Sequence, residues 1–485
     1  MKKIISIVLA LVLMLGLSAC TDKASTDNVS SDITTLKVYQ IGTKPDGWAE
    51  VEAAFNEKIK KDLGIVTHWE FISSGSYTEK MNIIMAASEQ FDVCFTGFAN
   101  PIATAVRNGA FLPLDDLIKE HVPELKDAMP SYWWDVATFD GKIYAVPNQQ
   151  VAAMPSGIYT YKRLADKYNF DMQSIRCIED LEPMLEVIKK NEPQLWAYRA
   201  SASARAPFVE KPADRPSYEN LESGLVAEKV GDKIKVVNVY ETPSYYHALE
   251  TFNKWFKKGY IREDIVSVMD DNNDFKAKKY AFDSSNWKPG VEVEIMKNQG
   301  EEIVYSYLFN KGYATTASCD STMFAISRTT VDPVASIKFL NYINTNVEAY
   351  NILASGLEGK HYDMQEDGRI KIKEGNTYPI GAGWKWGNQF NAYVTNTQDI
   401  DVWDQTRKLN EEARVSPIMG FRVDSSSFLT EKAQVAGVIS EFSALQFREY
   451  EKLLPEFLKR LDEAGLPKIQ AEYQKQINAF LKAKK

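Results

Sequence analysis

Aromatic and amide side chains in predicted loops are the residues of this 485-residue sequence best suited to holding a small molecule. An aromatic ring offers a flat apolar face, and Asn and Gln amides donate and accept hydrogen bonds in one plane. The candidate binding residues are Trp48, Tyr77, Thr96, Phe98, Asn148, Gln149, Trp287, Trp384, Trp386 and Asn388. For each aromatic residue among them, a place in the hydrophobic core is the alternative.

Glycines flank the densest aromatic segment, which reads Gly-Trp-Lys-Trp-Gly-Asn-Gln over 383–389. Because glycine lacks a Cβ, we expect at least one of these indoles to stand clear of its own backbone. Trp287 follows Asn286 in a second predicted loop, over 283–290. By contrast, we expect the run Tyr132-Trp133-Trp134 to serve packing.

The elements that position these residues begin with an alternation of strands and helices. Hydrophobic periodicity predicts strands over 36–41, 65–72 and 91–95, with helices over 48–61 and 77–89 between them. This order predicts a parallel sheet covered by helices, and ligands bind beyond the carboxyl ends of such strands. The loops at those ends are 42–48, 73–77 and 96–101.

Later segments repeat the mixture of strands and helices. Gly231-Asp232 predicts a hairpin turn between strands over 226–230 and 233–239. A further strand is predicted over 321–327, followed by a helix over 333–344. The final 60 residues show apolar stripes over 435–445, 450–461 and 469–481, which predict helices. The fold class is therefore α/β, with helices at the carboxyl end.

Composition and motifs exclude several classes of function. The net charge of -9 argues against nucleic-acid binding and against docking on an anionic membrane by charge. Cys94, Cys177 and Cys319 have no zinc-binding spacing, and we expect them to be buried. The acidic run 270–274 lacks the glycine and closing glutamate of a calcium loop, so we interpret it as solvated. We expect no metal and no cofactor.

The amino terminus predicts export and a lipid anchor. Lys2 and Lys3 precede an apolar run over 4–17 that is too short for a comfortable membrane span. Leu17-Ser18-Ala19-Cys20 then resembles the bacterial lipobox. We therefore expect a signal peptide over 1–19, a lipidated Cys20 and a flexible tether to residue 35. An ordinary signal peptide is the alternative.

Six segments in this order resemble the family 1 extracellular solute-binding proteins, which include maltose-binding protein. The resemblance is to the lipoprotein subgroup from Firmicutes with a distinctive carboxy-terminal domain. The matching segments are 112–117, 140–147, 333–340, 353–362, 420–424 and 464–474. One departure is Phe95-Thr96-Gly97-Phe98, which lacks the aspartate that many carbohydrate binders carry at this strand end.

The resemblance implies a two-lobed periplasmic-binding-protein-like fold that closes over a ligand at a hinge. Lobe 1 is expected over 36–148 plus 315–347, and lobe 2 over 149–314 plus 348–485. The chain is expected to cross between lobes near 147–151, before Ser321, and near 344–349. Asn148 and Gln149 would then face the cleft from the hinge.

The resemblance also implies a function without catalysis. We expect a monomeric, extracytoplasmic lipoprotein, anchored to the outer face of the bacterial membrane, that delivers a carbohydrate to the permease subunits of an ABC importer. The same fold binding a peptide or another nutrient is one alternative, and a sensor partner for a membrane kinase is a second. A third is a secreted glycoside hydrolase, although a GxSxG nucleophile motif, a phosphate loop and a dinucleotide fingerprint are absent from the sequence.

Overall fold

The computed structural model describes residues 33–201, 218–268, 270–307 and 312–484. The predicted signal peptide, Cys20 and most of the tether lie outside these residues. Three clusters of buried hydrophobic side chains organise the described chain. Within it, no helix combines the length and the apolar character that a membrane crossing requires.

The first sheet has five strands, two of which come from far along the chain. Their order is β2 (Ile65–Ile72), β1 (Thr34–Ile41), β3 (Val93–Gly97), β15 (Thr322–Ile326) and β6 (Val146–Pro147). β1 pairs in parallel with β2 and β3, whereas β15 runs antiparallel to β3 and β6. The parallel pairs confirm the predicted β-α-β-α-β order. The loops after β1, β2 and β3 therefore leave the same edge of the sheet.

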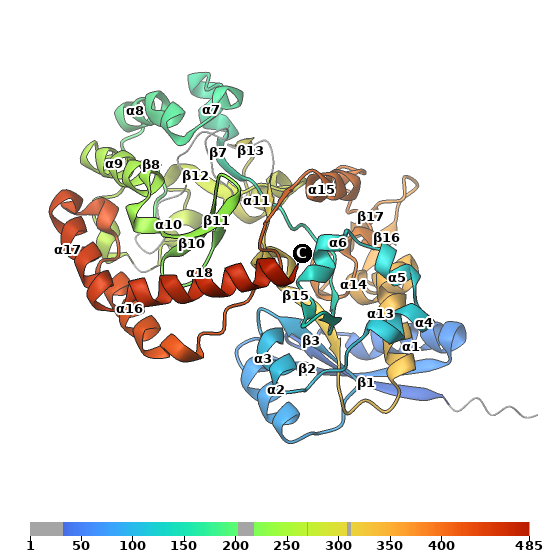
Figure 1. Cartoon of the computed structure of the whole chain (residues 1–485). Coiled ribbons are helices and arrows are strands. Elements are labelled where there is room, and N and C mark those ends of the chain that lie inside the picture. The colour runs from blue at the N-terminus through green and yellow to red at the C-terminus, as the bar shows by residue number, and fades with distance from the viewer. Residues whose placement is uncertain (1–32, 202–217, 269, 308–311, 485) are drawn as a thin grey trace, which may run out of the picture. The chain divides into compact units, whose positions relative to one another are not determined.

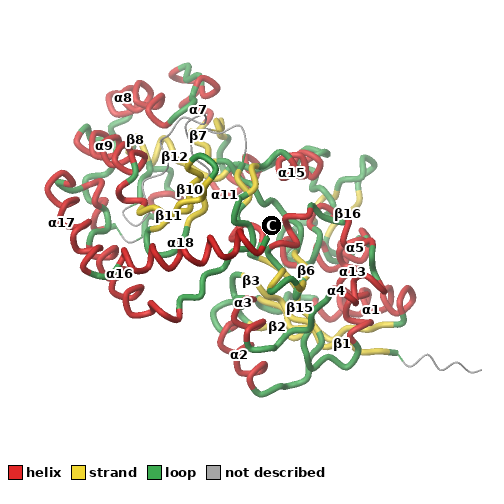
Figure 2. The backbone as a smooth tube through the Cα atoms, viewed as in Figure 1, coloured by secondary structure: helices red, strands yellow, loops and turns green. Residues whose placement is uncertain are grey.

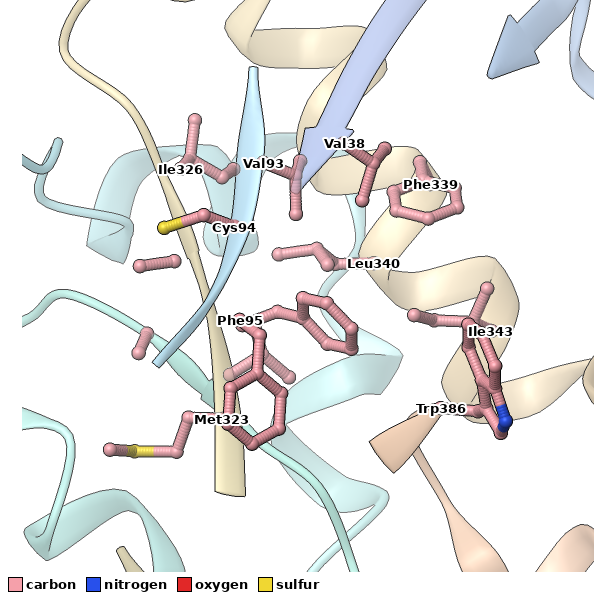
Figure 3. Packing of buried hydrophobic residues seen from close by; sticks show 14 of the residues in the cluster. Val38, Val93, Cys94, Phe95, Met323, Ile326, Phe339, Leu340, Ile343 and Trp386 are labelled. Carbon is pink, nitrogen blue, oxygen red and sulfur yellow. The ribbon is translucent and has the colours of Figure 1, made fainter. Parts of the chain in front are cut away.

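Helices α1 (Trp48–Leu63) and α13 (Pro333–Thr345) bury apolar stripes in the cluster around this sheet. In α1, Val51, Phe55 and Ile59 recur at four-residue spacing and are fully buried. The Asp332 side chain caps α13 by accepting from the Ala335 N–H at 2.9 Å. Figure 3 shows Phe339, Leu340 and Ile343 of α13 facing the strand residues of this core, with Trp386 beside Ile343.

The other helices of this cluster are short. They are α2 (Tyr77–Ala86), α3 (Ile102–Arg107), α4 (Asp115–His121), α5 (Glu124–Asp127), α6 (Ser131–Asp135) and α14 (Val347–Ser355). Trp133 and Trp134 of α6 are buried in the cluster, which confirms their predicted packing role. A two-stranded ribbon of β4 (Thr138–Phe139) and β5 (Lys142–Ile143) precedes β6.

The segment after residue 347 packs differently from the prediction. Tyr350, Leu353, Tyr378 and Trp386 belong to the same buried cluster as the first sheet. Helix α14 contacts α1, and the chain then continues through β16 (Tyr362–Met364), β17 (Ile370–Ile372) and α15 (Val402–Glu411). The predicted crossing near 344–349 is therefore not found there. Apolar residues over 349–354 instead hold the chain on the first cluster.

The second sheet has the order β13 (Ile303–Tyr307), β7 (Ser156–Tyr161), β12 (Tyr280–Asn286) and β8 (Trp196–Tyr198). β12 is parallel to β8 and antiparallel to β7. The helices around it are α7 (Lys162–Tyr168), α8 (Glu182–Asn191), α9 (Pro243–Lys257), α10 (Asn272–Lys276) and α11 (Val291–Gln299). Side chains such as Leu164, Leu185 and Trp255 form its separate core.

A third cluster joins an antiparallel sheet to the final helices. β9 (Tyr218–Asn220), β10 (Leu225–Val230) and β11 (Lys233–Asn238) pack against α16 (Leu429–Glu441), α17 (Tyr450–Glu463) and α18 (Leu466–Ala483). Figures 1 and 2 show α18 running alongside β11. Gln474 of α18 accepts from the Val236 N–H at 2.8 Å and donates to the Ile234 carbonyl at 3.0 Å. These bonds cover the open edge of the sheet.

Three segments link the first cluster to the others. The first follows β6, and the second contains β14 (Tyr313–Ala314) and helix α12 (Thr316–Cys319). The third contains β18 (Arg414–Val415), which pairs in parallel with β14. The Asn410 side chain forms two hydrogen bonds with the backbone of the first segment. It accepts from the Ala152 N–H and donates to the Gln150 carbonyl, both at 2.8 Å.

Candidate ligand-binding site

The loop after β3 presents an aromatic pair at the carboxyl edge of the first sheet. Phe98 is 58% exposed, and its ring centroid lies 6.0 Å from that of Trp384. Trp384 is half-buried, and both rings also contact Phe95, a buried residue in the middle of β3. Two candidates from distant parts of the sequence thus lie side by side and keep apolar surface in contact with solvent.

An amide side chain of the first crossing forms a hydrogen bond with the backbone of Trp384. Asn148 Nδ2 donates to the Trp384 carbonyl at 3.1 Å, and the Asn148 N–H donates to the Thr322 carbonyl at 2.9 Å. Asn148 Oδ1 and Gln149 Nε2 are buried without a hydrogen-bond partner among the described residues. A buried polar group without a partner costs free energy, so this crossing is less stable than a fully hydrogen-bonded one.

Gln150 completes the polar side of the site, and the sequence-based analysis missed it. Its Nε2 donates to Ser321 Oγ at 3.1 Å and to Thr322 Oγ1 at 2.9 Å, which fixes the amide across two crossings. The signal was its place directly after Asn148 and Gln149, the amides that were predicted. A planar amide next to Trp384 can form paired hydrogen bonds with a polar ligand.

A cavity of about 150 Å³ opens between Gln150, Trp384 and residues that follow β12. Its wall combines rings with polar groups. The residues that line it include Val151, Lys288, Pro289, Glu294, Gln389, Tyr393, Gln398, Trp403 and Thr406. Sequence-based reasoning missed Tyr393 and Trp403, which lie outside the glycine-flanked segment. Rings mixed with amides and hydroxyls suit a ligand with apolar faces and polar edges.

Trp287 lies near this cavity, although its ring packs on the second core. The ring is half-buried, and its Nε1 donates to Glu292 Oε1 at 3.2 Å. Its backbone N–H donates to the Pro155 carbonyl at 2.7 Å, which anchors the end of β12 to the first crossing. The next residues, Lys288 and Pro289, line the cavity. Trp287 thus lies next to residues that line the cavity, as expected for a binding residue. Its contact with a ligand stays a prediction.

Trp48 and Trp386 are not exposed platforms, which corrects the expectation for both. Each is 1% exposed, and the two rings stack with centroids 5.7 Å apart and planes 7° from parallel. Trp69 packs edge-on against both rings. The glycines serve close packing, since a Cβ on Gly387 would lie 2.8 Å from the Ile343 carbonyl oxygen. These indoles stabilise the first core.

Three other candidates have structural roles in this conformation. Tyr77 is fully buried, and its hydroxyl donates to the carbonyls of Tyr39 and Phe95 at 3.2 and 2.9 Å. Thr96 is fully buried and donates to the Asn100 carbonyl at 2.5 Å. The Asn388 side chain accepts from the Phe390 N–H at 3.1 Å. These polar groups bond to nearby backbone, and the binding roles of the three residues stay predictions.

Lys385 lies between the two tryptophans and was not predicted. The residue is 9% exposed, and its Nζ has no hydrogen-bond or ion-pair partner among the described residues. Nζ lies 5.6 Å from the centroid of the Trp386 ring. Burial lowers the pKa of Lys385. A buried cation without a counter-charge is exceptional, because lysine is rarely buried unless it is paired.

Several charged groups elsewhere form ion pairs within the protein. Arg422 Nη2 lies 2.6 Å from Asp320 Oδ2, as expected for a structural ion pair. In the acidic run 270–274, Asp271 binds Arg199 at 2.7 Å and Asp274 binds Arg262 at 2.8 Å. Part of this run is therefore held by arginines, which corrects its interpretation as solvated. Among the described residues, no cluster of His, Cys, Asp or Glu is arranged to hold a metal.

Two family models match the chain. The model for bacterial extracellular solute-binding proteins matches residues 46–349. A second, for a domain of unknown function named DUF3502, matches residues 417–482. The second range coincides with the helices α16, α17 and α18 of the third cluster, so the predicted distinctive carboxy-terminal domain is confirmed.

Similar proteins and structures cover nearly the whole chain. A Streptococcus pneumoniae protein described as a carbohydrate ABC transporter substrate-binding protein is 30% identical over 97% of this chain and 96% of its own length. The crystal structure of the N-glycan transport solute binding protein NgtS from S. pneumoniae is 26% identical, with a TM-score of 0.81 over 93% of this chain and 100% of that one.

NgtS in complex with Man5GlcNAc gives a TM-score of 0.65 at 26% identity, over 93% of this chain and 99% of that one. A solute-binding protein from Bifidobacterium longum infantis, described as HMO binding, shares 16% identity and a TM-score of 0.68 over 93% and 99% of the chains. The latter likeness shows the fold alone, and this fold is the predicted two-lobed solute-binding fold. The chain belongs to the family of bacterial extracellular solute-binding proteins.

Proposed function

We propose that this protein is the substrate-binding component of a carbohydrate ABC importer and that it captures an oligosaccharide without cleaving it. The relative with 30% identity is described as a carbohydrate ABC transporter substrate-binding protein. NgtS, a structural relative, has been solved with Man1GlcNAc and with Man5GlcNAc. The family consists of extracellular solute-binding proteins, which supports a function outside the cytoplasm.

The Phe98–Trp384 pair, which keeps apolar surface in contact with solvent, is the observation that carries the proposal. A sugar ring has apolar C–H faces that stack on aromatic rings and hydroxyl edges that bond to planar amides. Phe98 and Trp384 supply the rings, and Gln150 supplies an amide that is already fixed in place. Such groups, held on strand ends and crossing segments, bind with little loss of side-chain entropy.

The cavity beside Trp384 extends this surface toward the second core. Lys288 and Glu294 line it from one side, and Gln150 and Gln389 line it from the other. A ligand that contacts both sides stabilises the conformation in which they are close, because it binds that conformation better. This is the physical basis on which hinge closure would report occupancy to the permease.

We also propose a lipid anchor on Cys20, the last residue of the segment 17–20. It would hold the protein on the outer face of the cell membrane, with the residues to 35 as a tether. Globomycin-sensitive processing and release of the protein by Cys20→Ser would support the anchor. A Cys20→Ser protein that stays on the membrane would contradict it.

A ligand screen with the purified protein tests the binding function. Thermal shift against oligosaccharides, monosaccharides, amino acids and short peptides is the measurement, since ligand binding to the native state raises its melting temperature. We expect a selective shift with one class of oligosaccharide and unchanged saccharide by chromatography after prolonged incubation. A shift with peptides alone would contradict the carbohydrate assignment, and cleavage of the saccharide would contradict a binding role.

A further inference from the structure

Lys385 is a buried cation that the protein itself leaves without a counter-charge. Other cations with little exposure are neutralised, as Arg262 is by Asp264 at 2.6 Å and by Asp274 at 2.8 Å. Lys58 is likewise paired, with Glu348 at 2.7 Å. Lys385 is 9% exposed and has no such partner among the described residues. Burying an unpaired charge destabilises a protein, so this position calls for a reason other than stability.

The ammonium lies at the ligand-facing edge of the first sheet. A methyl group built on Gly42, the residue directly after β1, would lie 3.6 Å from Lys385 Nζ. The backbone of Lys385 is fixed there, because its carbonyl accepts from the fully buried Gln40 Nε2 at 3.0 Å. The loop 42–48 that begins at Gly42 is one of those from which ligands are bound in such sheets.

The surroundings of this loop are rich in basic groups. Lys44 within the loop is exposed, and a methyl group on Gly47 would lie 3.6 Å from His361 Nε2. Lys360 is also near Gly47, and it pairs with Glu50 at 2.5 Å. Asp46 is the acidic residue of the loop, and it is exposed. Burial alone accounts for the lowered pKa of Lys385, without an opposing effect of a carboxylate.

We propose that Lys385 binds the carboxylate or sulfate of an acidic saccharide and makes the protein select acidic over neutral saccharides. This inference rests on the proposed function and adds a substrate class to it. A buried ammonium that lacks a partner forms a strong charge-assisted hydrogen bond with an anion that reaches it. The anion also removes the cost of leaving the cation unpaired. Stacking on Phe98 and Trp384 then serves acidic and neutral sugars alike.

Paired ligands and a single substitution test the inference. The probes are oligosaccharides that carry galacturonate, glucuronate or sialic acid, each paired with its neutral methyl ester, and sulfated oligosaccharides paired with their unsulfated forms. Titration calorimetry should show that the native protein prefers the anionic member of a pair. Lys385→Met should lower affinity for that member by about 10-fold or more, the effect of about 1.4 kcal/mol, and leave affinity for the neutral member unchanged.

Lys61→Met is the matched control, because Lys61 is an exposed lysine on α1. It removes the same charge and should leave both affinities unchanged. Lys385→Met should also melt no lower than the native protein, since it removes an unpaired buried charge and keeps the length of the side chain. A structural lysine would show the opposite, a lower melting temperature with the same preference for anionic probes.

The outcomes separate this inference from the proposed function. Binding of neutral saccharides with no preference for the anionic member contradicts the role of Lys385 and leaves the carbohydrate-binding function standing. Equal loss of affinity for both members of a pair also contradicts it, because that result indicates general damage to the site. If the native protein binds peptides and no saccharide, the proposed function fails, and this inference fails with it.

Discussion

Trp384 and Trp386 are two residues apart in one glycine-flanked segment and have opposite environments. Trp386 is 1% exposed and stacks on Trp48 in the first core, whereas Trp384 is half-buried beside the exposed Phe98. The two positions differ in what their neighbours require. Ile343 and Trp69 enclose Trp386, while the groups around Trp384 bond to its backbone and leave part of its ring open. The local sequence around the two tryptophans is nearly the same. The residues that pack against each ring therefore decide which of them can contact a ligand.

Trp386→Ala should have the largest effect on stability. Removing a fully buried indole from the stack with Trp48 leaves a cavity, and such substitutions cost roughly 3–5 kcal/mol. Denaturant unfolding followed by circular dichroism measures this change in the free energy of unfolding. A cost below about 1 kcal/mol would contradict the assignment of Trp386 to the core and would reopen its role as a binding platform.

Trp384→Ala should mainly weaken binding. We expect a loss of affinity of about 10-fold or more for the preferred oligosaccharide, since one ring face of the platform disappears. Its cost in stability should be smaller than that of Trp386→Ala, because the ring is only half-buried. Calorimetry gives the affinity, and the same unfolding assay gives the stability. Equal destabilisation by the two substitutions would remove the distinction between the two indoles.

Lys385→Met, at the residue between the two tryptophans, should stabilise the protein at neutral pH by on the order of 1 kcal/mol. Because burial lowers the pKa of Lys385, the folded state binds its proton less strongly than the unfolded state does. The native protein therefore regains stability as pH rises through the lowered pKa. The difference between Lys385→Met and the native protein should shrink toward pH about 10.4, the ordinary lysine pKa. Melting temperatures across this range check the sign, and a constant difference would contradict it.

Phe98→Ala should have the smallest effect on stability and a clear effect on binding. With 58% of its surface exposed, Phe98 contributes little burial, so the free energy of unfolding should change by less than about 1 kcal/mol. Affinity for the oligosaccharide should fall several-fold, because the ring supplies half of the exposed pair. Exposed Ile83 on α2 provides the control, since Ile83→Ala should leave the affinity unchanged. Unchanged binding by Phe98→Ala would limit the platform to Trp384.

Regular elements were predictable because their periodicity is local. The strand over 65–72 and the turn at Gly231-Asp232 agree with β2 and with the hairpin of β10 and β11. The last crossing was misplaced because nothing local shows that Tyr350 and Leu353 pack on the first core. Only the three-dimensional structure pairs β18 with β14 there.

The binding residues were harder to predict than the helices and strands, because the burial of a side chain depends on residues that are distant in the sequence. The glycines at 383 and 387 suggested that the neighbouring indoles stand clear of the backbone. Instead, the lack of a Cβ lets the backbone at these glycines lie close to the Tyr350 hydroxyl and the Ile343 carbonyl. Lys385 carried no sequence signal, since only its burial without a partner distinguishes it from other lysines. The pairing of Phe98 with Trp384, which are 286 residues apart in number, also needed the fold.

A structure of the protein in complex with the oligosaccharide that binds best is the most direct test of the proposed site. We expect a sugar ring against Phe98 and Trp384, with a hydrogen bond to the Gln150 amide and no contact with the ring of Trp48 or Trp386. A sugar stacked on Trp48 or Trp386, or one bound away from the end of β3, would contradict it.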